Sequence, residues 1–161
     1  FHYQYKANRI IDETGIDGGL IAHVGFDSEK LLSAFHFNDR YIVHGLSQNM
    51  KKIKSAREYL RKKDLYGRVT VQQWRDKTLP YSDNLVNLLV VEDSGELSRQ
   101  EMMRVLSPEG SAYVKQNGEW TQWVKPRPDS IDKWSHYLHG PSNNPVANDL
   151  AVGPPRRLRW K

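Results

Sequence analysis

Two adjacent carboxylates, Glu92 and Asp93, are the residues best placed to do chemistry, because they directly follow an apolar run at residues 85–91. A continuous apolar run of this length is typical of a central strand buried on both faces. In an open α/β sheet the ligand crevice lies at the carboxyl ends of the strands, where a carboxylate can act as a general acid or base. The alternative is that both residues cap the following helix or face solvent.

Histidine is the other residue type that could carry chemistry. On a helix His136 and His139 would lie near each other, but a metal site needs a third ligand. The nearby acidic residues are only nominal ligands: Asp132 and Asp149. We therefore assign no metal site. The histidines of the predicted strands are expected to be hydrogen-bonded core or rim residues: His23 and His44.

Alternating strand and helix patterns position these residues. Strands are predicted at residues 19–25, 40–46, 67–73, 85–91 and 111–115, with a hairpin partner at 120–124 after a turn at Gly118 and Glu119. Helices are predicted at residues 3–14, after a capping Ser28, at 49–63 with Met50, Ile53, Ala56 and Leu60 facing inward, and at 98–106, ended by residues 107–110. This order predicts an α/β, Rossmann-like fold: a mostly parallel sheet with helices on both faces.

The chain length of 161 residues fits one domain, which we place at residues 1–125. Six of the eight prolines follow residue 125, so residues 126–161 are predicted to form an extended tail or linker, with at most a helical turn or two at 131–138. The chain begins at Phe1, and we expect that it is processed or part of something longer.

Composition excludes several classes of protein. No run of about 18 apolar residues occurs, so we expect a soluble protein without a membrane span. The absence of cysteine excludes disulfides and thiolate metal sites. A net charge of +5 is modest for a nucleic-acid binder, and we do not expect that activity. The basic cluster within residues 51–63 is interpreted as a solvated helix face.

Four stretches, in this order, resemble motifs of class I S-adenosylmethionine (SAM)-dependent methyltransferases: residues 20–25 (LIAHVG), 43–46 (VHGL), 79–84 (LPYSDN) and 104–110 (RVLSPEG). The last two are similar to the LPF-x-D and RVL-x-PGG signatures of that family, and the resemblance covers about residues 10–125. It implies a Rossmann-like domain and, if the domain is active, SAM as the cofactor.

The tail carries a second resemblance. Residues 134–140 (WSHYLHG), 148–149 and 152–160 (VGPPRRLRW) are similar to a junction in large bacterial secreted proteins. There a methyltransferase-like region precedes a β-propeller of the pyrroloquinoline-quinone dehydrogenase type. This resemblance implies a periplasmic or otherwise extracytoplasmic location. We expect a protein partner or adjoining domain to be bound through the tail and the tryptophans: Trp74, Trp120, Trp123, Trp134 and Trp160.

The methyltransferase resemblance implies a glycine-rich turn after the first strand, because the amino-acid end of SAM must approach the backbone closely. Only Gly25 matches here. Asp27 and Glu29 stand at the two later glycine positions. Their side chains add bulk and negative charge near the expected place of SAM's own carboxylate, which disfavours binding.

The acidic positions of the family's cofactor site are also changed. The residue that accepts hydrogen bonds from the ribose corresponds to Ser47, and the one near the adenine corresponds to Arg75, although the adjacent Asp76 restores it after a shift of one residue. The acidic position at the start of the fourth strand corresponds to Asn87. The candidate cofactor residues are Gly25, Asp27, Ser47 and Asp76.

Our preferred hypothesis is a degenerate methyltransferase-like domain without catalysis or cofactor, acting as a structural or protein-interaction module in a larger assembly. The alternative is an active SAM-dependent methyltransferase with an atypical cofactor motif and with Glu92 or Asp93 near the substrate. The alternative predicts an open crevice at the carboxyl ends of the first and fourth strands. The preferred hypothesis predicts that side chains such as Phe26 or Trp74 fill it. A third possibility is another nucleotide, for which no P-loop motif is present.

Overall fold

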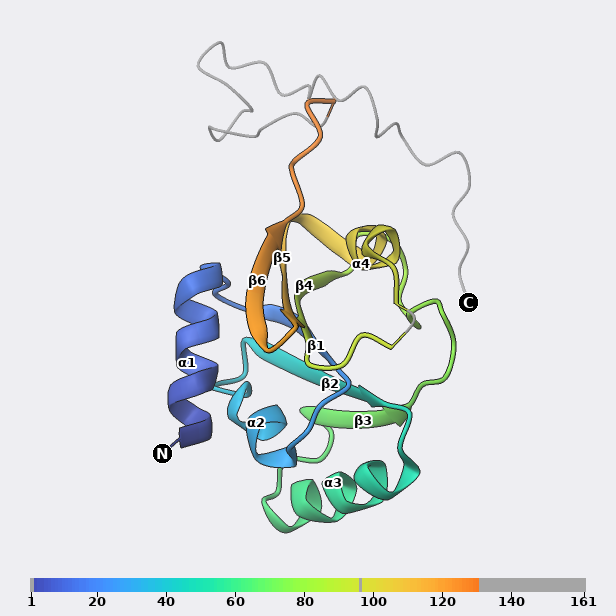
Figure 1. Ribbon diagram of the computed structural model, residues 1–161. Coiled ribbons are helices and arrows are strands. Elements are labelled where there is room, and N and C mark those ends of the chain that lie inside the picture. The colour runs from blue at the N-terminus through green and yellow to red at the C-terminus, as the bar shows by residue number, and fades with distance from the viewer. Residues whose placement is uncertain (1, 96, 131–161) are drawn as a thin grey trace, which may run out of the picture. The chain divides into compact units, whose positions relative to one another are not determined.

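A six-stranded sheet lies at the centre of the computed structural model, which describes residues 2–95 and 97–130 (Figure 1). The strands are β1 (Gly19–Val24), β2 (Tyr41–Ser47), β3 (Val69–Gln73), β4 (Val86–Val91), β5 (Leu106–Gln116) and β6 (Glu119–Val124). They lie side by side in the order β3-β2-β1-β4-β5-β6. The helices of the described ranges are α1 (His2–Thr14), α2 (Glu29–Ala34), α3 (Met50–Lys62) and α4 (Arg99–Val105).

The first five strands are parallel, and β6 runs antiparallel to β5. Strand β1 is central, because Ile21 is in register with Val43 of β2 on one side and with Leu88 of β4 on the other. A two-residue turn at Asn117 and Gly118 joins β5 to β6, and both residues have a positive φ, 51° and 87°. Two positive φ angles are typical of a type I′ hairpin turn, so the strand begins at position 119, one residue earlier than predicted.

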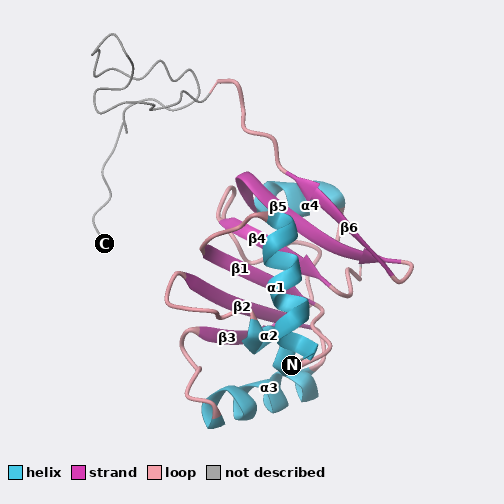
Figure 2. Cartoon of the chain, turned by 90° about the vertical axis from the view of Figure 1, so that its left-hand side faces the viewer, coloured by secondary structure: helices cyan, strands magenta, loops and turns pink. Residues whose placement is uncertain are grey.

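Helices cover both faces of the sheet. In Figure 2 α1 and α2 lie in front of the strands and α4 lies behind them. The hydrophobic core is divided in the same way, since Ile10 of α1, Leu32 of α2 and Leu60 of α3 belong to one cluster. Met102 and Val105 of α4 belong to the other. The predicted α/β class, with a mostly parallel sheet and helices on both faces, is confirmed.

Local signals in the sequence explain where the helices begin and end. Three helices begin directly after a side chain that accepts a hydrogen bond from a backbone N–H of the first turn: Ser28 before α2, Asn49 before α3 and Ser98 before α4. Such a cap satisfies a donor that the helix itself leaves free. Helix α1 ends at Gly15, which has a φ of +67° as predicted for a left-handed C-cap.

The predicted inward orientation of Met50 is wrong. Its side chain is 41% exposed, whereas Ile53, Ala56 and Leu60 of the same helix are fully buried. At about 100° per residue, Met50 lies roughly 90° from the centre of the stripe that these three residues form. It therefore sits at the edge of the apolar face and not within it.

The predicted start of the fifth strand at residue 111 is wrong, because residues 107–110, which were expected only to end the helix, belong to β5. Leu106 pairs with Val86 and Ser111 pairs with Leu88, so β5 has several more residues than β4 over this part of the ladder. Glu109 has a φ of +65°, and its N–H donates to the Lys125 carbonyl at 2.9 Å. Strand β5 thus begins at Leu106 and is irregular and bulged before Ser111.

The compact unit that holds the sheet ends at Lys125. Of the predicted tail, the structure describes residues 126–130. The rest lies outside the described residues, together with the predicted helical turn at 131–138, both candidate metal-binding histidines and two tryptophans: His136, His139, Trp134 and Trp160. Within the described ranges, no helix combines the length and the apolar character needed to cross a membrane.

Two of the motif-like stretches, residues 79–84 and 104–110, are tied together by one guanidinium group. Arg104 binds both carboxylate oxygens of Glu101, at 2.7 and 2.8 Å, and also donates to Asp83 Oδ1 at 2.6 Å and to the Tyr81 carbonyl at 3.0 Å. Glu101 in turn accepts the Leu79 N–H at 2.7 Å. These stretches therefore have a structural role of their own: they anchor the loop between β3 and β4 to α4.

The variant Arg104→Ala removes this anchor and leaves the buried carboxylate of Glu101 without its charge partner. Since breaking a buried ion pair by removing one member is costly, we expect the free energy of unfolding to fall by about 2–4 kcal/mol. Urea unfolding measures the change. As a matched control, Gln100→Ala on the exposed side of the same helix should change it by less than about 0.5 kcal/mol. Equal effects of the two variants would contradict this account.

The same network predicts a pH dependence. The hydrogen bonds from Arg104 hold the pKa of Glu101 below its ordinary value. A carboxyl group whose pKa is lower in the folded state stabilises the fold above its unfolded-state pKa, and this contribution is lost as the pH falls through the folded-state pKa. We expect the stability difference between the wild type and Arg104→Ala to shrink below about pH 4.3, measured by urea unfolding from pH 7 to pH 3. A constant difference would show that the Glu101 charge is not involved.

Candidate functional site

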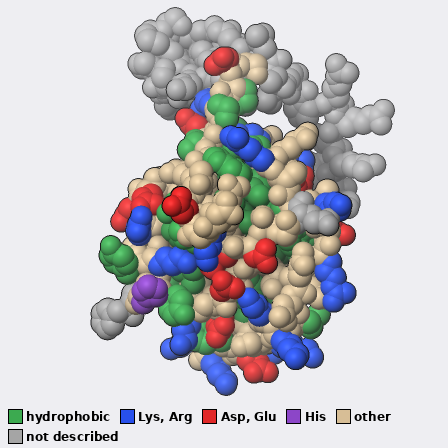
Figure 3. Space-filling model, in the orientation of Figure 1, with side chains coloured by type: hydrophobic (Ala, Val, Ile, Leu, Met, Phe, Trp, Pro, Cys, Tyr) green, Lys and Arg blue, Asp and Glu red, His purple; other side chains and the backbone are tan. Residues whose placement is uncertain are grey.

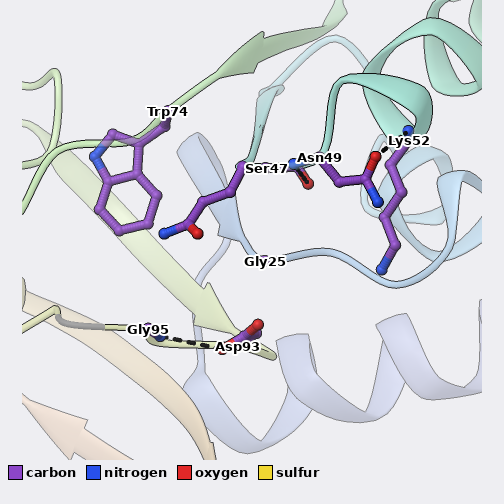
Figure 4. A pocket seen from close by; sticks show the side chains of 8 residues that line it. Gly25, Ser47, Asn49, Lys52, Trp74, Asp93 and Gly95 are labelled. Atoms are coloured by element: carbon purple, nitrogen blue, oxygen red, sulfur yellow. Dashed lines mark hydrogen bonds between the residues drawn. The ribbon is translucent and has the colours of Figure 1, made fainter.

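The strand order reverses between β1 and β4, and in α/β sheets such a switch point is where ligands bind, at the carboxyl ends of the strands. A cavity of about 200 Å³ lies at this place (Figure 4). Its lining residues come from the carboxyl ends of the first four strands and from the start of α3: Gly25, Ser47, Gln48, Asn49, Lys52, Trp74, Asp93 and Gly95.

Trp74 and Lys52 lie on opposite sides of the cavity, with Asp93 and Gly95 on a third side (Figure 4). Trp74 is buried, and its indole N–H donates to a backbone carbonyl at 2.8 Å, so it forms a fixed wall. Phe26, the other side chain predicted to fill the crevice, lies instead in the core cluster on the α1–α3 face of the sheet.

Gly25 marks a close approach of the chain to itself. It has a φ of +65°, and its N–H donates to the Leu46 carbonyl at 2.8 Å. A Cβ atom at this position would lie 2.7 Å from both N and Cβ of Asp93. A side chain at position 25 would therefore collide with the backbone of Asp93, so this close contact requires a glycine.

Asp27 is not one of the residues that line the cavity. Its side chain is 65% exposed, and its carboxylate accepts a hydrogen bond from Lys52 Nζ at 2.9 Å, which holds the pKa of Asp27 below its ordinary value. Glu29 stands in the first turn of α2, where a negative charge is favourable. Both carboxylates, at the positions where the resemblance implies glycine, thus serve local structure.

Ser47 and Asp76, the other candidate cofactor residues, are separated by the structure. Ser47 lines the cavity, but it is 4% exposed and its hydroxyl accepts a hydrogen bond from the Asn49 N–H at 3.2 Å. Asp76 and the adjacent Arg75 are exposed, and neither lines the cavity. The structure therefore brings Gly25 and Ser47 together and leaves Asp76 outside.

The two candidate catalytic carboxylates point in different directions. Glu92 has a side chain that is only 4% exposed, and its Oε1 lies 2.9 Å from Nε2 of the fully buried His23. Asp93 lines the cavity and accepts the Gly95 N–H at 3.1 Å. Of the predicted acid–base pair, only Asp93 faces the cavity, while Glu92 is an internal partner of a buried histidine.

The sequence reading missed the pairing of His23 with Glu92. The two residues are in contact because β1 and β4 are neighbours, and the Glu92 N–H donates to the Val24 carbonyl at 3.0 Å. Nδ1 of His23 has no hydrogen-bond partner, and the rings of Phe26 and Phe35 surround the imidazole at centroid distances of 6.1 and 5.5 Å. The usable signal was that one ionisable residue lies inside a strand predicted to be buried and the other directly follows such a strand.

Two further polar residues of the sheet also have structural partners. His44 Nδ1 lies 2.9 Å from the hydroxyl of Tyr81. Burial lowers the pKa of His44 and raises that of Tyr81, so the phenol donates to a neutral imidazole. Asn87 accepts the Leu20 N–H at 3.0 Å, at the opposite end of the strands from the cavity. The expectation that His23 and His44 are hydrogen-bonded core or rim residues agrees with these contacts.

The chemistry open to the cavity is limited. Its ionisable side chains are Lys52, which is paired with Asp27, and Asp93. Its volume is below the range of about 300–1,000 Å³ in which ligand pockets usually fall. Within the described ranges, no three His, Asp or Glu residues are grouped so that they could hold a metal ion. At the position that corresponds to the ribose-binding carboxylate in the resemblance, Ser47 supplies only a hydroxyl, which already accepts a hydrogen bond from Asn49.

The added methyl group of the variant Gly25→Ala tests how closely the backbone of Asp93 approaches residue 25. Gly25→Ala adds a clash with backbone to the strain of a positive φ, and we expect it to lower the free energy of unfolding by about 3 kcal/mol or more in urea unfolding. Gly118→Ala is the matched control. Gly118 has a φ of +87°, and a Cβ atom added there would meet no atom within 4 Å beyond its chain neighbours. This control should cost only the strain, about 1 kcal/mol. Equal costs would refute the close approach.

Comparison with known proteins gives similarity in structure alone: no protein-family model matches the chain, and no curated protein matches its sequence. A protein from Methanococcus maripaludis assigned as a SAM-dependent methyltransferase is 22% identical with a TM-score of 0.61, over 70% of this chain and 54% of that one. The cyclase SpnF is also 22% identical, with a TM-score of 0.61 over 71% and 46% of the two chains.

Geranyl diphosphate C-methyltransferase from Streptomyces coelicolor, in a complex that includes S-adenosyl-L-homocysteine, is 14% identical with a TM-score of 0.60, over 68% of this chain and 44% of that one. The chain spans about half the length of the solved structures that it matches. At these identities the comparisons establish the architecture. The chain has a methyltransferase-like fold.

Proposed function

We propose that this domain is a degenerate member of the methyltransferase-like architecture, which has no SAM-dependent catalysis and acts as a structural or protein-interaction module. One observation carries the proposal. At the switch point of the sheet, the polar groups that a SAM site would use are already bonded within the chain, around a cavity of about 200 Å³.

The energetic argument concerns the lost hydrogen bonds. A charge-assisted bond from a ribose hydroxyl to a carboxylate contributes about 1.5–3 kcal/mol, and Ser47 supplies only a hydroxyl that is already bonded to Asn49. Its loss alone corresponds to about one to two powers of ten in affinity.

The fold itself does not argue for methyl transfer. One of the similar structures is named a cyclase, and the same architecture commonly supports unrelated functions. Function therefore has to be argued from the site, and the site favours a module without catalysis.

The proposal includes a larger, exported assembly, in which the tail and the tryptophans contact a partner protein or an adjoining domain. Its basis is the resemblance of residues 134–160 to a junction in secreted proteins, a stretch outside the described residues. Loss of the SAM site is consistent with an extracytoplasmic location, because SAM is made and kept in the cytoplasm.

The second candidate function is an active SAM-dependent methyltransferase. The observation that favours it is Asp93, a carboxylate that lines the cavity at the carboxyl end of β4, where a general base could stand. Glu92 is less suited to that role, because its carboxylate is buried against His23.

Calorimetric titration with SAM and with S-adenosylhomocysteine separates the two candidates. We expect no heat of binding under conditions that detect a Kd of about 1 mM or tighter, with circular dichroism showing that the protein is folded. A methyltransferase known to bind SAM serves as the positive control for the ligand. A micromolar Kd would overturn the proposal.

A pair of variants ties any binding to the cavity. If heat is observed, Ser47→Ala should weaken it and Met50→Ala, an exposed position at the start of α3, should not. That combined result would assign SAM to the cavity and support the active enzyme. Binding that both variants leave unchanged would place SAM elsewhere and would leave the account of the cavity intact.

A further inference from the structure

Strand β6 is the edge of the sheet, and no described strand pairs with its outer side. An unpaired edge is a template for a further strand, and proteins usually blunt it with proline, lysine or a bulge. The sequence of β6, EWTQWV, contains neither proline nor lysine, and its only charge is Glu119 at the start. Among the described residues, the outer side of β6 is therefore free to pair with a further strand.

The hydrogen bonding shows which backbone groups this edge offers. Lys125, directly after β6, bonds to the β5 strand through both its N–H and its carbonyl. In an antiparallel pair, successive residues alternate between bonding to the partner and facing away. Lys125 faces β5, so the alternate residues of β6 present their N–H and carbonyl groups outward. These residues are Trp120, Gln122 and Val124.

One face of β6 opens into a groove beside α1. Trp120 is stacked on Tyr113, with ring centroids 4.9 Å apart, and Lys6 Nζ lies 4.8 Å from the Trp120 ring. The groove has a volume of about 320 Å³ and no carboxylate in its lining, which includes Lys6 and Arg9. Lys115 is directly opposite Trp120 in the ladder. This face combines aromatic surface with positive charge.

A neighbouring carboxylate, Glu13, offsets the charge of Arg9, so Lys6 and Lys115 carry the positive charge of this face. Its two oxygens accept hydrogen bonds from Arg9 at 2.7 Å and from the Tyr113 hydroxyl at 2.6 Å. These bonds hold Tyr113 under Trp120 and keep the pKa of Glu13 below its ordinary value. Glu13 therefore positions the Tyr113 ring on which Trp120 is stacked.

The opposite face of β6 repeats the pattern. Trp123 is partly buried against the α4 side of the core, and the Arg99 guanidinium lies 4.7 Å from its ring. Figure 3 shows hydrophobic side chains at the surface over the upper part of β5 and β6, with Lys and Arg side chains beside them. Each face of the edge strand thus presents a tryptophan accompanied by a cation.

We propose that β6 binds an extended acidic segment of a partner protein as an added strand, with apolar or aromatic side chains of that segment against Trp120 and Trp123. Main-chain hydrogen bonds to an edge give affinity in this mode, and side-chain pockets on alternate positions give specificity. An added strand places side chains on both faces of β6 at once. The cations on both faces, Lys6 and Arg99, complement acidic side chains.

A second copy of the chain fits the edge less well. Pairing of β6 with itself would bring two basic surfaces together, including Lys6, Lys115 and Arg99 of each copy, and like charges in contact oppose association. The proposal rests on the interaction-module function proposed above and names the chemistry of its partner.

The test selects binders from a random octapeptide library displayed on phage, with the full chain as bait. We expect the selected peptides to be rich in Asp and Glu with interspersed aromatic or β-branched residues. The variant Gln122→Pro removes an outward N–H, and we expect it to weaken synthetic copies of these peptides by about tenfold or more in fluorescence anisotropy. Gln122→Val keeps the N–H and should bind within about twofold of the wild type.

A charge reversal gives an independent arm, because it touches no backbone group of the sheet. Lys6→Glu should weaken the acidic peptides by about threefold or more, and by less as salt is raised. Circular dichroism and urea unfolding confirm that each variant is folded.

Three results would overturn the proposal. The first is a set of selected peptides without acidic enrichment, and the second is equal affinity of the wild type and Gln122→Pro for the peptides. The third is a wild-type dimer that Gln122→Pro dissociates, which would assign the edge to a second copy. The calorimetric test is independent of these results. SAM binding would refute the module function while leaving β6 a docking edge, and failure of the peptide test would refute the edge while leaving the cofactor argument unchanged.

Discussion

The close approach of Gly25 to the backbone of Asp93 is the constraint on which the carboxyl end of the sheet depends. It joins the chain after β1 to the chain after β4, at the point where the strand order reverses. Beneath it, Glu92 is turned into the core against His23, which leaves Asp93 to face outward. The shape of the cavity beside Gly25 follows from this contact.

The architecture could be predicted from the sequence because its signals are local. Apolar runs marked the buried strands, and Ser28, Asn49 and Ser98 marked the helix starts. The errors arose where a local signal competed with pairing between distant segments. Residues 107–110 contain proline and glycine and were expected only to end the helix, yet hydrogen bonds to Lys125 draw them into a strand.

The candidate site was only partly predictable, for a related reason. Gly25 and Ser47 follow strands whose neighbours were evident from the pattern, and they do lie together. The opposed directions of Glu92 and Asp93 could not be predicted, because they depend on which face of β4 each residue takes at the strand end. The role of Lys52 was hidden as well, since its partner Asp27 lies 25 positions earlier and is exposed.

The pairing of β1 with β4 also has a consequence for how the chain reaches its native state. Leu20 and Asn87, which are hydrogen-bonded across these strands, are 67 positions apart in sequence, whereas the β5–β6 hairpin closes through a two-residue turn. Contacts between distant residues slow folding, and local ones form early. We therefore expect the β5–β6 hairpin to form earlier in folding than the central ladder between β1 and β4.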